Sequence, residues 1–120
     1  MRLRILLFVA VAALATASIA GSMTVPKLFG TVGPGFTISL KSHGKTVKSL
    51  TAGSYTFVVS DKGSIHNFVL ERKTGGKFEK AITTIPFTGT KTVTVKLGKG
   101  KWKYYCKAHE STMFGFFTVK

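Results

Sequence analysis

The chain has 120 residues, and its 18 lysines and arginines against four acidic residues give a formal net charge of +14 at pH 7. A hydrophobic content of 44% with ten phenylalanines excludes a disordered basic tail and indicates a strongly basic globular protein. Once the N-terminus is set aside, about a hundred residues remain, enough for one modest core but not for a second domain.

Residues 1–20 have the pattern of a cleaved signal peptide. Arg2 and Arg4 precede an apolar run over residues 5–15, and small residues suited to cleavage follow. This run is shorter than the roughly 18 residues that a membrane span needs, which disfavours an uncleaved anchor. We therefore predict export to the periplasm or the extracellular space, with loss of the two arginines and a mature charge of +12.

The rest of the chain predicts an all-β fold. Short alternating runs are separated by turn residues, as in an antiparallel Greek-key β-sandwich, and no amphipathic helix is evident. We assign residues 21–30 to an N-terminal extension and residues 31–120 to the sandwich domain.

Two strands in the first half are expected to carry alternating core residues. Phe36, Ile38 and Leu40 follow a Gly-Pro-Gly turn and predict one strand with these three side chains in the core. The next turn contains His43, which we interpret as an exposed loop residue. Further on, a strand over residues 65–70 is expected to direct His66 into the interior at one end of the sheet.

The second half contains the clearest strand patterns. Residues 90–97 alternate threonine or lysine with Val93, Val95 and Leu97, which predicts a strand with one buried face. Residues 101–106 form the next predicted strand, in which the period of two brings the Cys106 thiol inward at the strand end.

Candidate metal ligands are concentrated after this strand. Cys106, His109 and Met113 lie within eight positions, and His66 supplies a second imidazole. Two imidazoles, a thiolate and a weakly bound thioether are the ligands of a mononuclear type 1 copper site. Each residue alone could instead be structural: a buried thiol, a hydrogen-bonded core histidine or a methionine that fills a gap. The single cysteine, unpaired in an exported protein, favours the metal interpretation.

These residues give the chain a resemblance to the cupredoxins, in particular to plastocyanin- and azurin-like secreted domains of bacteria, over residues 31–120. The matching residues are His66, Asn67, Phe68, Cys106, His109, Met113, Gly115 and the run Phe116–Val119. The resemblance implies copper held by His66, Cys106, His109 and, as the weak axial donor, Met113. It also implies that Asn67 ties the two ligand segments together, although an asparagine at a strand end can equally bond its own backbone.

The resemblance further implies a solvent-facing edge of the His109 ring through which electrons pass. Phe114, Pro34, Phe36 and Pro86 are candidates for an apolar rim around that edge, and each could equally be an ordinary core or loop residue.

The function predicted from these patterns is a one-electron carrier rather than an enzyme. A copper-binding module for sequestration or delivery could use the same ligands, and a cationic interaction domain without metal is a third possibility. With only three histidines in the chain, one copper site leaves too few for the further histidine-bound copper of copper enzymes. The charge favours acidic redox partners or an anionic envelope surface; no nucleic-acid motif is present, and we expect a monomer.

Overall fold

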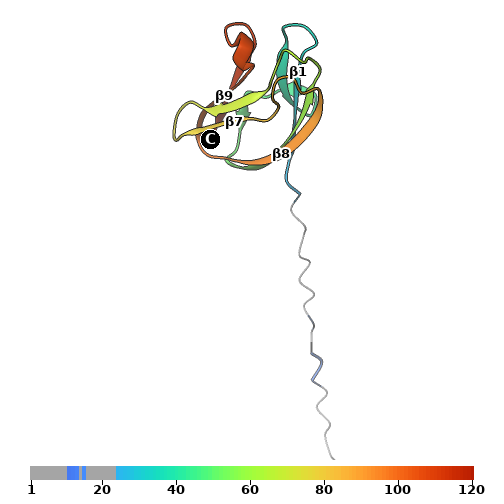
Figure 1. The fold of residues 1–120 in the computed structure, drawn as a ribbon. Helices are drawn as coiled ribbons and strands as arrows, with labels where there is room; N and C mark the ends of the chain where they lie inside the picture. Colours follow the sequence, from blue (N-terminus) through green and yellow to red (C-terminus); the bar gives the residue numbers. More distant parts are fainter. Residues whose placement is uncertain (1–10, 14, 16–23) are drawn as a thin grey trace, which may run out of the picture.

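The computed structural model describes residues 11–13, 15 and 24–120 (Figure 1). Apart from residues 11–13 and 15, the predicted signal peptide lies outside the described residues. Within residues 11–13, 15 and 24–120, no helix is sufficiently long and apolar to cross a membrane.

Within residues 24–120, ten strands form two five-stranded sheets. In spatial order, the first sheet consists of β3 (Lys45–Thr46), β2 (Ile38–Ser42), β1 (Lys27–Val32), β5 (Gly53–Asp61) and β8 (Gly89–Leu97). The second sheet consists of β4 (Ser49–Leu50), β10 (Phe114–Val119), β9 (Gly100–Tyr105), β6 (Val69–Arg72) and β7 (Phe78–Ala81). A single turn of 3-10 helix, η1 (Lys107–His109), lies between β9 and β10.

The predicted sandwich is confirmed, but its sheets are mixed rather than purely antiparallel. β1 pairs with β5 in parallel, and β10 pairs with β4 in parallel, whereas the other pairings are antiparallel. Parallel neighbours need a long connection, and the chain between β1 and β5 provides one by passing through β2, β3 and β4.

The sandwich begins earlier than the sequence suggested. β1 starts at Lys27, and Leu28 is buried in the core, so the boundary expected at residue 31 falls inside the first strand. β1 lies between β2 and β5 in the first sheet, and its buried face, with Leu28 and Val32, faces the core between the two sheets.

The core lies between the two sheets and follows the alternation read from the sequence. In β8, Val95 and Leu97 are buried and Val93 is partly buried, as predicted. The remaining large buried side chains come from both sheets and from the loops at their ends: Leu28, Val32, Leu40, Phe57, Val59, Phe68, Leu70, Trp102, Tyr104, Met113, Phe117 and Val119.

Two strand predictions were wrong at the N-terminal ends of β2 and β6. Phe36 lies in the bend before β2 and is 61% exposed, because the strand begins only at Ile38. His66 lies in a loop, since the chain turns after Gly63 and β6 starts at Val69. His66 is nevertheless buried, so its inward direction does not require a strand.

The two faces of the first sheet should differ sharply in their tolerance of truncation. Phe57 on β5 is fully buried, whereas Phe29 on the neighbouring β1 is half exposed. We expect Phe57→Ala to lower the free energy of unfolding by about 3–5 kcal/mol, through lost burial and a residual cavity. Phe29→Ala should lower it by less than about 1 kcal/mol. Urea denaturation of both variants measures this, and equal losses would contradict the assigned faces.

Candidate metal centre

The segment from Cys106 to Met113 is a closed loop at one end of the sandwich. Cys106 directly follows β9 and Met113 directly precedes β10, and the backbone N–H of Cys106 donates to the Met113 carbonyl over 3.0 Å. Inside the loop, the N–H groups of His109 and Met113 donate to the carbonyls of Cys106 (3.1 Å) and His109 (2.8 Å). In Figure 1 this loop, with η1, projects from the end of the sandwich. The two strands and these hydrogen bonds therefore fix the backbone position of His109.

Two glycines make room for the His66 ring: Gly63 in the same loop and Gly33 in the loop after β1. The His66 N–H donates to the Gly63 carbonyl over 3.0 Å, which folds the loop back on itself. A Cβ at Gly63 would lie 2.7 Å from Cδ2 of the His66 ring, and one at Gly33 would lie 3.2 Å from the same atom. Gly33 also has a φ of +68°, which side-chain-bearing residues rarely adopt. Both glycines thus leave the space that the buried ring occupies.

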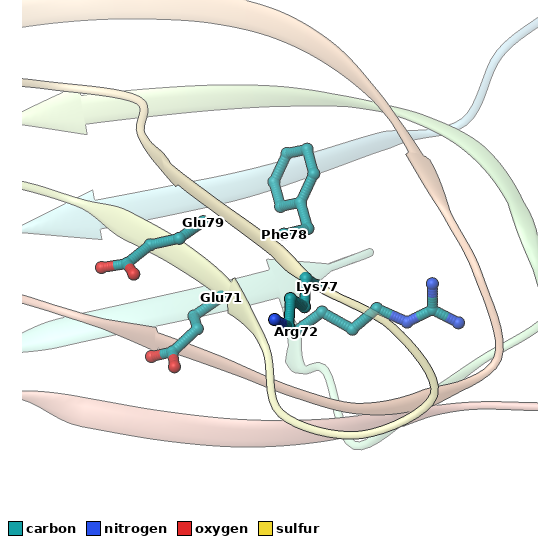
Figure 2. A pocket seen from close by; sticks show the side chains of 5 residues that line it. All are labelled: Glu71, Arg72, Lys77, Phe78 and Glu79. Carbon is teal, nitrogen blue, oxygen red and sulfur yellow. The ribbon is translucent and has the colours of Figure 1, made fainter.

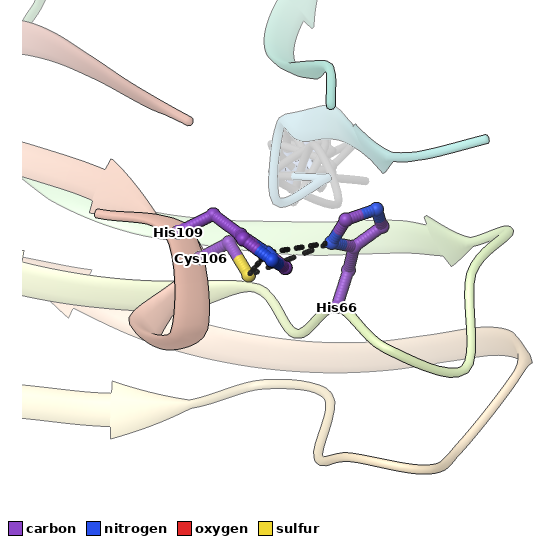
Figure 3. A group of neighbouring side chains, drawn as sticks. All are labelled: His66, Cys106 and His109. Atoms are coloured by element: carbon purple, nitrogen blue, oxygen red, sulfur yellow. Dashed lines mark hydrogen bonds between the residues drawn. The ribbon is translucent and has the colours of Figure 1, made fainter. Parts of the chain in front are cut away.

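The structure brings the side chains of His66, Cys106 and His109 together (Figure 3). The two histidine Nδ1 atoms are 3.1 Å apart, and Sγ of Cys106 lies 3.8 Å from Nδ1 of His66 and 3.6 Å from Nδ1 of His109. The three donor atoms come from two loops that are 40 residues apart in the sequence.

The spacing of these donor atoms fits a three-coordinate metal ion. Bonds of about 2.0 Å to nitrogen and 2.3 Å to sulfur, spread over a plane, separate the nitrogens by about 3.5 Å and each nitrogen from sulfur by about 3.7 Å. The observed separations of 3.1, 3.6 and 3.8 Å lie close to these values. Two imidazoles with one thiolate are also the donor set that type 1 copper uses.

The cluster is buried on two sides and accessible on the third. Cys106 and His66 are essentially inaccessible to solvent, whereas His109 is partly exposed. The exposed Phe36 ring meets both imidazoles edge-on, with centroids 4.9 Å from His109 and 5.6 Å from His66. Phe36 thus contacts the cluster, as expected of a rim residue. Pro34 and Pro86 are exposed, and Phe114 packs against Phe116.

Asn67 links the two ligand segments. Its side-chain Oδ1 accepts a hydrogen bond of 2.9 Å from the backbone N–H of Lys107, the residue after Cys106. Asn67 is buried and Lys107 is exposed, so the bond is partly shielded from water. Next to it, the N–H of Phe68 donates to Oγ1 of the buried Thr83 over 2.9 Å. The loop that carries His66 is thus fastened to the Cys106 loop on one side and to the segment before Thr84 on the other.

The other two candidates from the sequence are in different environments. Met113 is fully buried within the core cluster that also contains Cys106. His43 is exposed in the turn between β2 and β3, has a φ of 49°, and takes no part in the His-Cys-His cluster, as expected.

Two side-chain contacts of β9 lie next to the ligand loop: an ion pair of Lys103 with Glu110 and a hydrogen bond of Tyr105 with Glu79. Lys103 on β9 donates to Glu110, the neighbour of His109, over 2.8 Å, and this hydrogen bond lowers the pKa of the Glu110 carboxyl. Tyr105 precedes Cys106 and donates to Glu79 over 2.5 Å; its burial and, secondarily, this bond raise the pKa of the phenol. Sequence analysis did not identify these contacts because each joins residues on different elements.

An open hollow on the β6–β7 hairpin is separate from this centre. It is lined by Glu71, Arg72, Lys77, Phe78 and Glu79, and shares no residue with the cluster (Figure 2). Its carboxylates already have partners, since Glu71 pairs with Lys73 and Glu79 with Tyr105. The hollow therefore offers no comparable set of convergent donors.

Comparison with known proteins supports the fold. No protein-family model matches the sequence, and a search of curated proteins gives no match. Among solved structures, auracyanin A, a "blue" copper protein from Chloroflexus aurantiacus, is 17% identical with a TM-score of 0.55, over 81% of this chain and all of that one. Rusticyanin from Thiobacillus ferrooxidans is 23% identical with a TM-score of 0.51, over 78% of this chain and 76% of that one. At these identities the likeness shows the fold alone, which is that of the cupredoxins.

The link between Asn67 and Lys107 should be measurable. Asn67→Ala removes the Oδ1 acceptor of the partly buried Lys107 N–H, and leaving such a group without its partner costs about 1–3 kcal/mol. We expect a loss of that size in the free energy of unfolding, together with faster hydrogen exchange at the Lys107 amide by NMR.

Thr112→Ala is the matched control, since it removes a long, exposed hydrogen bond of 3.4 Å within the same loop. It should change stability by less than about 0.5 kcal/mol. Unchanged exchange at Lys107 in Asn67→Ala would contradict the proposed link.

Proposed function

Because the chain has a cupredoxin fold with a His-Cys-His cluster at one end, we propose that it binds one copper ion as a type 1 centre and carries single electrons outside the cytoplasm. In this proposal His66, His109 and Cys106 are the three strong ligands, and Met113 is the weak axial donor. The convergence of two Nδ1 atoms and one Sγ within 4.8 Å of one another carries the proposal.

Copper held by these donors would supply a Cu(II)/Cu(I) couple, which transfers one electron without a proton. The role of the chain is to keep the donor atoms in nearly the same place in both states. Cys106 and His109 belong to a loop closed by backbone hydrogen bonds, and Asn67 fastens that loop to the His66 segment. Ligands fixed in this way by outer partners reorganise little when the charge changes.

Burial of the cluster supports electron transfer rather than catalysis. The inaccessible Cys106 thiol is protected from oxidants, and the closed side around His66 keeps water from the donor atoms. Only the partly exposed His109, beside the exposed Phe36 ring, lies near the surface. A small apolar contact of this kind suits a short-lived encounter between redox proteins.

The charge of the chain supports a preference for acidic redox partners. A mature charge of +12, reached if the two arginines of the predicted signal peptide are removed, would steer oppositely charged proteins toward the surface and make association depend on salt. Export, action as a monomer and acidic partners belong to this proposal, with the N-terminal sequence pattern as the support for export.

Addition of Cu(II) to the exported protein tests the proposal. We expect an intense visible band from thiolate-to-copper charge transfer, lost in Cys106→Ser because the oxygen ligand cannot give it. Ascorbate should bleach the band and ferricyanide should restore it over repeated cycles.

His43→Gln is the control, because His43 lies in an exposed turn outside the cluster; it should leave the band unchanged, whereas His66→Gln should remove or shift it. A colourless product with readily chelated copper would instead favour the rival function of copper sequestration or delivery. A band that survives Cys106→Ser would contradict the assigned ligands.

A further inference from the structure

The outer face of the first sheet is a continuous surface of hydroxyl and lysine side chains. Strand register assigns to this face every residue that alternates with the buried ones on β1, β2, β5 and β8. Its members are Lys27, Phe29, Thr31, Ser39, Lys41, Ser54, Thr56, Val58, Ser60, Thr90, Thr92, Thr94 and Lys96. We call this set the hydroxyl–lysine face.

This face carries no side-chain carboxylate. The four acidic residues of the sequence all fall in the described part of the chain: Asp61 is buried, and Glu71, Glu79 and Glu110 lie on the second sheet or on the ligand loop. The charged side chains of the hydroxyl–lysine face are therefore all positive. An anionic partner meets no repulsive group there, whereas the second sheet presents carboxylates.

The three lysines of the face form a diagonal line across the strands. Lys41 on β2 pairs with Phe29 on β1, and Lys27 precedes Phe29 by two residues on β1. Thr94 is the residue of β8 that is level with Lys27, and Lys96 lies two residues past it, displaced in the same direction. With strands about 4.8 Å apart and about 3.3 Å per residue, successive lysines are separated by about 8 and 12 Å at the backbone. Between them, the Oγ1 atoms of Thr56 and Thr94 lie 3.0 Å apart.

We infer that the hydroxyl–lysine face binds an acidic polysaccharide. A uronic acid polymer presents the two features that this face can recognise: a row of carboxylates for the lysines and ring hydroxyls for the threonines and serines. Hydroxyl side chains both donate and accept hydrogen bonds, so they can match sugar hydroxyls in either sense. The half-exposed Phe29 ring, at the centre of the face, offers an apolar surface on which a sugar ring can lie.

The composition of the face favours a polysaccharide over a bilayer or a nucleic acid. Binding to a membrane surface draws on apolar side chains that enter the headgroup region as well as on basic residues. Here Phe29 is the one large exposed apolar residue on the face. Single-stranded nucleic acid would need several stacking rings along a basic groove. On the hydroxyl–lysine face, threonines and serines outnumber both aromatic rings and lysines.

Binding on this face would leave the metal centre accessible. The ligands lie in loops at one end of the sandwich, whereas Lys27, Lys96 and Ser54 lie toward the other end of the strands. A protein held by the hydroxyl–lysine face would therefore keep His109 free for a redox partner. The inference concerns the sheet alone and holds whether or not copper is the metal bound.

Binding of the exported protein to polygalacturonate, measured by isothermal titration calorimetry at low ionic strength with dextran as the neutral polymer, tests the inference. Thr92→Glu places a carboxylate on the exposed side of β8, level with Phe29 and within the row of hydroxyls, and should weaken binding at least tenfold. Thr118→Glu is the matched control, because it makes the same change at an exposed position on β10 of the other sheet, and should change affinity less than twofold.

A second pair of variants separates the face from net charge. Lys27→Gln, Lys41→Gln and Lys96→Gln together should abolish measurable binding, whereas Lys77→Gln, Lys80→Gln and Lys99→Gln, with the same loss of charge elsewhere, should retain most of it. Thermal unfolding checks that all variants fold. Equal weakening by both triple variants, no binding to polygalacturonate, or tighter face-dependent binding to phosphatidylglycerol vesicles or to single-stranded DNA would overturn the inference.

Discussion

The loop between β9 and β10 is the constraint on which the rest of the metal centre depends. The antiparallel register that pairs Tyr105 with Phe114 fixes both ends of the loop, and the hydrogen bond from Cys106 to the Met113 carbonyl continues that ladder by one step. Only six residues remain to make the turn, so His109 has little freedom. The Asn67 side chain then fixes the second ligand segment to this loop through Lys107. Convergence of donors is thus a consequence of sheet pairing.

The same arrangement divides the surroundings of the cluster into a closed side and an open side. His66 and Cys106 are enclosed by the core and by the glycines of two loops, and His109 reaches the surface next to Phe36. A centre that exchanges only electrons needs no substrate cavity, and the hollow on the β6–β7 hairpin is unrelated to it. The hydroxyl–lysine face of the first sheet is separate again, so a ligand bound there would not cover His109.

Sequence patterns predicted those features that depend on local spacing. The alternation in residues 90–97 identified β8, and the concentration of thiol, imidazole and thioether after residue 105 located the ligand loop. The parallel pairings of β1 with β5 and β10 with β4 join distant segments and leave no local pattern. Alternation of apolar and polar residues places Phe36 and His66 in strands. In the structure both residues lie in loops next to glycines, just before β2 and β6 begin. The resemblance to cupredoxins did offer Phe36 as a candidate for the rim around His109, but strand alternation gives no sign of its contact with His66.

We propose that the chain holds two imidazoles and one thiolate in place for copper in either oxidation state. X-ray absorption at the copper edge, recorded on the oxidised and the reduced protein, tests it most directly. We expect two nitrogen scatterers and one sulfur scatterer at short distance in both states, with bond lengths that change little on reduction. Loss of the sulfur scatterer, or the gain of strongly bound oxygen ligands in one state, would contradict it.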